Sequence, residues 1–412
     1  MLEYNIIEGG VCAAEGFSAG GLHVGIKAGS NKKDLAVIYC ENKCNAAALF
    51  TQNKVKAAPI KVSKAHLADG KAQAIIVNSG NANACTANGI EIAEKMCELS
   101  AKSLGISCED VIVASTGVIG QELAIAPFEK GIPALVANLN KAGNDDAAQA
   151  IMTTDTFPKQ VAIEFELSDG TKCKIGGIAK GSGMINPNMA TMLAFITTDI
   201  DISAELLEWI LPPLNSHTFN AVSVDGDTST NDMLCIMASG LAGNKKIVVR
   251  NEDYGQFAGA LNVVMTDLAR KMARDGEGAT KLIECYVENA PDDKTANSIA
   301  KSVVSSSLVK AAIGAADANW GRILCAMGYA ADIADDFDVS KADVKLGSAK
   351  GEVIVCRNGM GVPFSEKEAT AILSEEEVQI YIDLHHPANV CGRAFGCDLT
   401  EEYVRINADY RS

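Results

Sequence analysis

Residues 180–195 read Lys-Gly-Ser-Gly-Met-Ile-Asn-Pro-Asn-Met-Ala-Thr-Met-Leu-Ala-Phe and lead from a loop into a strand. Glycine, proline and asparagine in 180–188 predict the loop, and the apolar run 191–198 predicts a buried strand. A threonine hydroxyl is a weak nucleophile, but a cut between Ala190 and Thr191 would free an α-amine as its base. On the spacing alone, an ordinary strand start explains this junction better, because β-branched threonine is common where strands begin.

The rest of the chain alternates between strand and helix patterns. Strands are predicted at 73–78, 110–114, 161–167, 171–178 and from 282, and helices at 89–104 and 254–273. This alternation indicates the α/β class. A length of 412 residues favours two domains, and the polar stretch 288–294 is the best candidate boundary, so we expect domains at 1–287 and 288–412.

Composition limits the partners of this chain. It is 48% hydrophobic and 21% charged, which is typical of a globular protein. Its net charge of −16 repels phosphate backbones and anionic lipids, so we expect neither nucleic-acid nor membrane partners. The N-terminus lacks the features of a signal peptide and no apolar run reaches the ~20 residues of a membrane span, which predicts a cytoplasmic protein.

Several generic motifs carry no function here. The 13 cysteines form no Cys-x-x-Cys pair and the five histidines no metal-binding spacing, so we expect no metal. No phosphate-binding glycine loop is present, so no nucleotide cofactor is implied. Gly16–Gly20 matches a serine-hydrolase elbow without its strand-to-helix context. Residues 225–232 look like a cation loop but lack the EF-hand glycine and glutamate, so an ordinary turn explains them.

The segment 180–195 closely resembles the self-processing segment of the glutamate N-acetyltransferase family, also called ornithine acetyltransferase. Other segments match that family in the same order: 78–86, 115–120, 153–156, 223–232, 275–281, 319–322 and 407–412. The resemblance therefore runs over essentially the whole chain. Departures at Ala124, Asn186 and Ala318 concern loops and do not touch the nucleophile.

The resemblance implies self-cleavage between Ala190 and Thr191, giving an α chain (1–190) and a β chain (191–412) that assemble as α2β2. It also implies a layered fold of the N-terminal-nucleophile type, in which two stacked β-sheets are flanked by helices. A smaller C-terminal α/β domain would contribute its tail to the substrate site.

The resemblance further implies the reaction. Thr191 would take the acetyl group of N2-acetylornithine and pass it to glutamate, giving ornithine and N-acetylglutamate in arginine biosynthesis. Thr116 and Gly117 would stabilise the oxyanion. The implied substrate contacts are Thr154, Lys180, Thr191, Glu277, Asn407 and Ser412, and no cofactor is implied.

Two other functions remain open at this point. The first is a self-cleaving amidohydrolase or aminopeptidase, in which water replaces glutamate as the acceptor. The second is a non-catalytic metabolite-binding relative that kept the fold. Within the transferase interpretation, no residue decides whether acetyl-CoA is a second acetyl donor.

Overall fold

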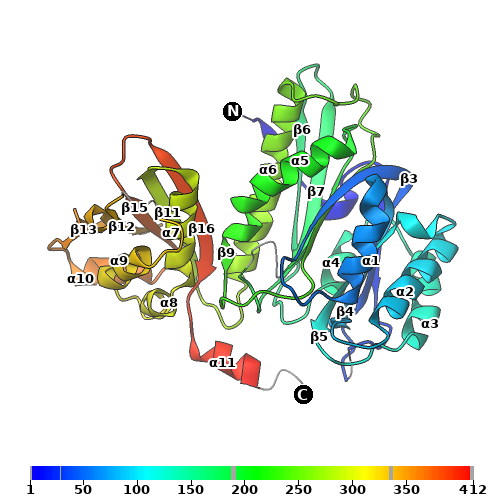
Figure 1. The fold of residues 1–412 in the computed structure, drawn as a ribbon, viewed down its shortest axis with the longest axis horizontal. Coiled ribbons are helices and arrows are strands. Elements are labelled where there is room, and N and C mark those ends of the chain that lie inside the picture. Colours follow the sequence, from blue (N-terminus) through cyan, green and yellow to red (C-terminus); the bar gives the residue numbers. More distant parts are fainter. Residues whose placement is uncertain (1, 28, 187–191, 334–336, 409–412) are drawn as a thin grey trace. The chain divides into compact units, whose positions relative to one another are not determined.

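The computed structural model describes residues 2–27, 29–186, 192–333 and 337–408. The chain divides into two compact units (Figure 1). Unit 1 takes the described residues of Met1–Gly181, Pro187–Asn215 and Thr228–Leu268, and unit 2 those of Ser182–Asn186, Ser216–Asp227 and Ala269–Ser412.

Unit 1 is built on a nine-stranded sheet of order β1-β6-β7-β8-β10-β3-β4-β5, with β2 paired to β3. Its strands are β1 (Tyr4–Ile7), β2 (Phe17–Leu22), β3 (Leu35–Phe50), β4 (Lys71–Asn81), β5 (Val111–Val118), β6 (Lys159–Glu166), β7 (Lys172–Lys180), β8 (Leu193–Thr198) and β10 (Met233–Ala238). The long strand β3 pairs with β2 and β4 in its first half and with β10 in its second half. The β3–β4 register shifts between Tyr39 and Cys44, so β3 belongs to two parts of the sheet.

These two parts stack face to face. Ile75 and Val77 of β4 share one apolar core with Phe195 of β8 and Met237 of β10. The alternate residue Ile76 faces the other way and packs in a second core with the helices beyond it. The predicted α/β fold with two stacked β-layers is confirmed.

Helices cover both outer faces of these layers (Figure 1). They are α1 (Ala58–His66), α2 (Gly89–Leu104), α3 (Ala126–Val136), α5 (Ala204–Ser216) and α6 (Glu252–Arg274). The short helix α4 (Asn144–Ala150) instead contributes Ala147, Ala148 and Ala150 to the core between the layers. Met96 of α2 and Phe128 of α3 are buried against the outer face of β4 and β5. On the opposite side, Leu268 of α6 lies against Gly177 of β7.

The local predictions agree with these elements. The helix expected at 89–104 is α2, which ends at Gly105 in the left-handed conformation that glycine favours. The predicted hairpin is formed by β6 and β7. Ser18 lies inside strand β2, so the Gly16–Gly20 pattern is not a nucleophile elbow.

Unit 2 has a seven-stranded sheet of order β14-β13-β12-β15-β11-β16-β9. Its strands are β9 (Val222–Ser223), β11 (Leu282–Ala290), β12 (Asp343–Ser348), β13 (Gly351–Arg357), β14 (Met360–Gly361), β15 (Glu377–Asp383) and β16 (Val390–Cys397). Its further helices are α7 (Asp293–Ser305), α8 (Ser307–Gly314), α9 (Trp320–Gly328), α10 (Glu366–Leu373) and α11 (Glu401–Ala408). The α7 backbone at Ala296 approaches Gly392 of β16 so closely that any side chain at Gly392 would collide with it.

No helix among the described residues combines the length and apolarity that crossing a bilayer requires.

Candidate active-site residues

Thr116 and Gly117 lie near the end of β5, as part of the strand itself. They pair in register with Ser79 and Gly80 of the parallel strand β4. A Cβ on Gly117 would stand 2.2 Å from the carbonyl carbon of Gly80, and the φ of Gly117 is 131°. Only glycine permits this close approach of two backbones. The contact with Gly80 therefore fixes the backbone conformation at residues 116–117.

Asn231, in the loop before β10, fixes the same strand end. Its side-chain amide donates 2.6 Å and 2.9 Å hydrogen bonds to the carbonyl oxygens of Ala82 and Ser115. Asn231 is 6% exposed, so both bonds are shielded from water. Sequence reasoning quoted its segment, 223–232, but gave Asn231 no role.

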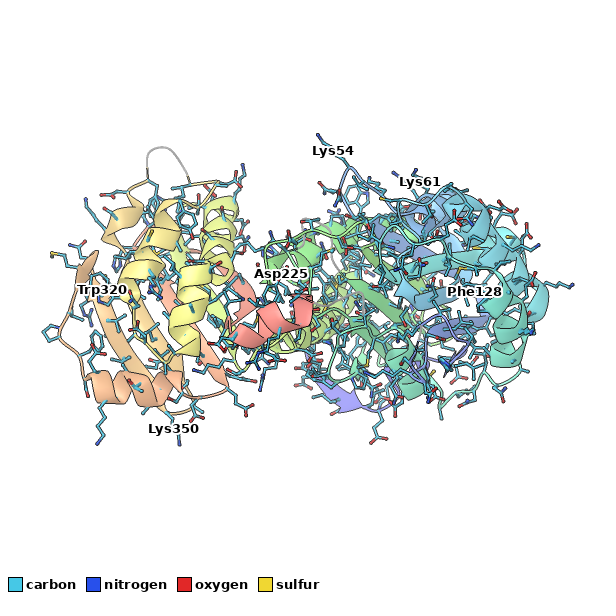
Figure 2. The ribbon with its side chains drawn as sticks, turned by 90° about the horizontal axis from the view of Figure 1, so that it is seen from below. Lys54, Lys61, Phe128, Asp225, Trp320 and Lys350 are labelled. Atoms are coloured by element: carbon cyan, nitrogen blue, oxygen red, sulfur yellow. The ribbon has the colours of Figure 1, made fainter. Side chains whose placement is uncertain are left out.

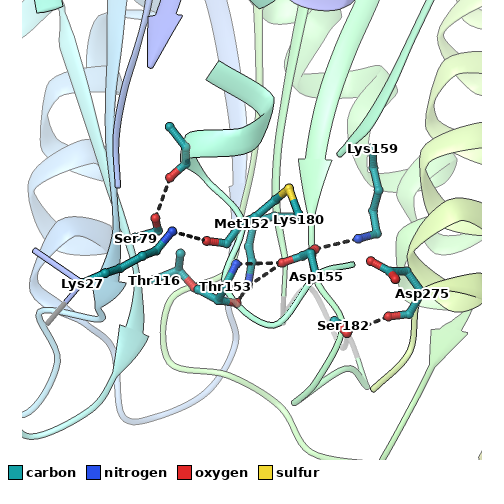
Figure 3. Close-up of polar contacts among 12 residues, drawn as sticks. Lys27, Ser79, Thr116, Met152, Thr153, Asp155, Lys159, Lys180, Ser182 and Asp275 are labelled. Carbon is teal, nitrogen blue, oxygen red and sulfur yellow. Dashed lines mark hydrogen bonds and ion pairs between the residues drawn. The ribbon is translucent and has the colours of Figure 1, made fainter. Parts of the chain in front are cut away.

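Lys180 is the last residue of β7 and is nearly buried, at 7% exposure. Its ammonium donates to the Thr153 hydroxyl at 2.7 Å and to the Thr116 hydroxyl at 3.4 Å (Figure 3). The structure thus brings together Lys180 and Thr116, which the resemblance had named. Thr154, also named, is half-buried and lies between Thr153 and Asp155.

Asp155 lies beside Lys180, with 4.0 Å between a carboxylate oxygen and the ammonium nitrogen. Asp155 was given no role in the sequence analysis. Its carboxylate accepts hydrogen bonds from Thr153 N (2.9 Å), Lys159 Nζ (2.6 Å) and Gly181 N (2.8 Å). Burial alone raises the pKa of this carboxyl, but the ammonium groups of Lys159 and Lys180 outweigh burial and hold the pKa well below its usual range. Asp155 is therefore a permanent buried anion. Asp155 could have been found from the sequence, because it lies within the segment 153–156 that matches the family.

Lys27 lies between β2 and β3 and contacts the loop that carries Thr153 and Asp155. Its ammonium donates to the carbonyl oxygens of Lys33 (2.8 Å) and Met152 (2.9 Å). Burial lowers the pKa of Lys27 to about 8. Lys27 thereby ties the β2–β3 connection to the loop that carries Thr153.

In unit 2 the structure brings together Glu277 and Asn407. Asn407 of α11 donates a 2.7 Å hydrogen bond from its side-chain amide to the Glu277 carboxylate. Glu277 is 6% exposed, and its carboxylate lies directly over the Cα of Gly183, where a Cβ would come within 2.3 Å of it. Gly183 is therefore glycine because the carboxylate of Glu277 occupies the space of a side chain.

Asp225 anchors residues 184 and 185 of the loop at 180–188. Its carboxylate accepts from Met184 N (2.6 Å) and Ile185 N (2.8 Å), and Val224 N donates to Ile185 O at 2.6 Å. Asp225 also accepts from Asp227 N at 3.2 Å. The bond from Asp227 N is the local turn that the sequence predicted, whereas the bonds from residues 184 and 185 are long-range contacts that it did not predict.

Three named positions, Ala190, Thr191 and Ser412, lie outside the described residues. The chain is described again from Met192, whose carbonyl oxygen accepts from Met233 N at 3.0 Å, and β8 begins at Leu193. All 13 cysteines are free thiols.

Comparison with known proteins places these residues in context. The sequence model of the ArgJ family matches residues 18–412. The arginine biosynthesis bifunctional protein ArgJ of Caldanaerobacter subterraneus subsp. tengcongensis is 48% identical over 408 residues, which cover 99% of this chain and 100% of that protein. The protein of the same name from Geobacillus kaustophilus is also 48% identical, over 99% of this chain and 97% of its own.

One solved structure adds a comparison of size. The crystal structure of the arginine biosynthesis bifunctional protein argJ from Bacillus halodurans is similar to this chain with a TM-score of 0.50 and 46% sequence identity. The match covers 99% of that solved chain but only 53% of this one. The solved chain is thus about half as long as this chain.

Proposed function

The chain belongs to the ArgJ family, and on that premise we propose that it transfers the acetyl group of N2-acetylornithine to glutamate through an acetyl-threonine ester on Thr191. It is an acyltransferase of arginine biosynthesis. The observation that carries this assignment is 48% identity to a relative over 99% of the chain. The family model matches residues 18–412, which contain every segment of the resemblance.

In the first half-reaction, the Thr191 hydroxyl attacks the acetyl carbonyl carbon and gives its proton to the freed α-amine. The carbon–nitrogen bond of N2-acetylornithine then breaks, and ornithine leaves with that proton. In the second half-reaction, the amine of glutamate attacks the ester carbon, N-acetylglutamate leaves and the hydroxyl is regenerated. Both halves pass through a tetrahedral oxyanion, for which we assign Thr116 and Gly117 as donors.

The unit 1 geometry supports that assignment. An oxyanion donor must be fixed before the reaction begins, because reorganisation during the reaction costs activation energy. The contact of Gly117 with Gly80 and the bonds from Asn231 hold this strand end in place from two directions.

The substrate contacts follow from charge. We assign Lys180 to a substrate carboxylate, with Thr154 beside it, because a nearly buried ammonium is a strong partner for an anion. We assign Glu277, held by Asn407, to the side-chain ammonium of ornithine. Ser412 is proposed to complete the substrate site at the C-terminal tail.

We further propose that the precursor cuts itself between Ala190 and Thr191 and assembles as α2β2 in the cytoplasm. Cleavage would give a β chain of 222 of the 412 residues, and the half-length Bacillus halodurans chain agrees with that size. Denaturing gels should show two bands from the wild-type chain and one band from Thr191→Ala.

The relatives are named bifunctional, which favours acetyl-CoA as a second acetyl donor. A steady-state assay with acetyl-CoA and glutamate as the only substrates tests this second activity. Formation of N-acetylglutamate supports it, and an enzyme that works only with N2-acetylornithine contradicts it.

Mass spectrometry tests the main reaction. Enzyme mixed with N2-acetylornithine alone should carry one acetyl group on the first residue of the β chain, and added glutamate should remove it. An acetyl group on a lysine would overturn the assignment of Thr191. Release of free acetate at the same rate with and without glutamate would make the protein a hydrolase.

A further inference from the structure

Lys159 is the least exposed of the described lysines, at 0%, followed by Lys310 at 3%. Lysines such as Lys54, Lys61 and Lys350 extend into solvent (Figure 2). Lys159, at the start of β6, is 0% exposed and donates its 2.6 Å hydrogen bond to a carboxylate that is also 0% exposed, that of Asp155. Its ammonium also lies 5.1 Å from the ring centre of Phe157. A buried ion pair of this kind carries a large desolvation cost, so stability alone is a weak reason for it.

The second cation beside Asp155 is Lys180, and its geometry is different. The ammonium of Lys180 is 4.0 Å from the nearer Asp155 oxygen, beyond the range of a hydrogen bond. It instead donates 2.7 Å and 3.4 Å hydrogen bonds to the Thr153 and Thr116 hydroxyls. Figure 3 shows Lys159 and Lys180 reaching Asp155 from different directions.

We propose that Asp155 and Lys159 form a positioning pair for Lys180. Lys159 neutralises the carboxylate at close range, so Lys180 stays beside Asp155 without being captured by it and keeps its ammonium directed at Thr116 and Thr153. This inference rests on the proposed function, in which Lys180 receives a substrate carboxylate.

Charge and hydrogen bonding support this division of roles. Two ammonium groups face one carboxylate, so the cluster keeps one positive charge in excess, which suits an anionic ligand. The carboxylate also accepts from Gly181 N, the residue after Lys180, and from Thr153 N, whose hydroxyl accepts from Lys180. Asp155 therefore defines both the backbone and the electrostatic surroundings of Lys180. Lys27, whose charge also acts on this cluster, adds a further cation.

Removing the charge of Lys159 tests the proposal. In Lys159→Met, Lys180 becomes the nearest cation to Asp155 and should turn towards it. KM for N2-acetylornithine should then rise roughly tenfold or more, the value of one charge-assisted hydrogen bond, while kcat changes much less. Lys159→Gln keeps a hydrogen-bond donor but removes the charge, and it should raise KM in the same way. It provides the test if the methionine variant does not fold.

The double variant Asp155→Asn with Lys159→Met removes the carboxylate that would capture Lys180. KM should fall back towards the wild-type value, so the second substitution rescues the first. A matched control is the Lys43–Asp110 pair, which has the same 2.6 Å separation but lies at the opposite end of β5 from Thr116. Lys43→Met should leave KM unchanged.

A purely structural role predicts a different result. The Lys159 variants would then lower the free energy of unfolding measured in urea but leave KM at the wild-type value, which overturns the proposal. A KM that stays raised in the double variant also overturns it. These outcomes require an active wild-type enzyme, whereas a wild type that transfers no acetyl group refutes the proposed function instead.

Discussion

The Glu277 carboxylate accepts a 2.7 Å hydrogen bond from the side-chain amide of Asn407, across 130 residues of sequence. Glu277 follows α6, and Asn407 lies on the last described helix, α11. The bond therefore links the C-terminal segment to a carboxylate that we assign to the ornithine ammonium. It orients the carboxylate without neutralising it.

Asn407→Ala should weaken substrate binding, because it removes the donor that orients the Glu277 carboxylate without adding a charge beside it. KM for N2-acetylornithine is expected to rise roughly tenfold, with a smaller change in kcat. Steady-state kinetics measure this. Asn138→Ala is the matched control, since Asn138 is an exposed asparagine whose amide donates a 2.7 Å hydrogen bond to Ala134 O. Equal effects in both variants would contradict the role of Asn407.

Gly117→Ala should abolish most transferase activity. The new Cβ would collide with the Gly80 carbonyl group, 2.2 Å away, so the strand end carrying the proposed oxyanion donors must move. Loss of one oxyanion donor typically lowers kcat by ~10²–10³-fold. Gly120→Ala separates collision from backbone strain, because Gly120 also has a positive φ, 77°, but has open space around it. It should retain most activity, and a similar loss in both variants would point to strain alone.

Asp225→Asn should slow self-cleavage. The carboxylate accepts from both Met184 N and Ile185 N, and an asparagine offers only one oxygen for these two donors. Losing one charge-assisted bond should lengthen the half-time of cleavage roughly tenfold. Densitometry of denaturing gels after a pulse of expression measures that half-time.

The control for Asp225 is Asp169→Asn, which alters an exposed turn aspartate that accepts from Thr171 N. It should cleave at the wild-type rate. Wild-type cleavage in Asp225→Asn would show that residues 184 and 185 need no anchor.

Lys27 should make stability depend on pH above neutrality. Burial lowers its pKa from 10.5 to about 8 in the folded protein. Between these values the unfolded chain binds more protons than the folded one, so the free energy of unfolding contributed by Lys27 rises as pH increases from about 8 to 10.5. Urea titrations of wild type and Lys27→Met should diverge across this range. A constant difference would contradict the lowered pKa.

The sequence by itself determined the class of the fold. The apolar alternation at 73–78 and the helical spacing over 89–104 are local patterns, and each became the predicted element. The sequence also identified the family, because motifs such as residues 180–195 are long and specific. The role of Thr191 stays a prediction, since it lies outside the described residues.

The tertiary structure decided which distant groups meet. No local pattern shows that Gly80 and Gly117 touch, because their contact arises from the parallel pairing of β4 and β5. Lys159 and Asp155 are four residues apart, yet their sequence reads as an ordinary charged loop until folding removes water from both. A charge acquires its chemical role from desolvation and from the groups that surround it, and these depend on long-range packing rather than on residue order.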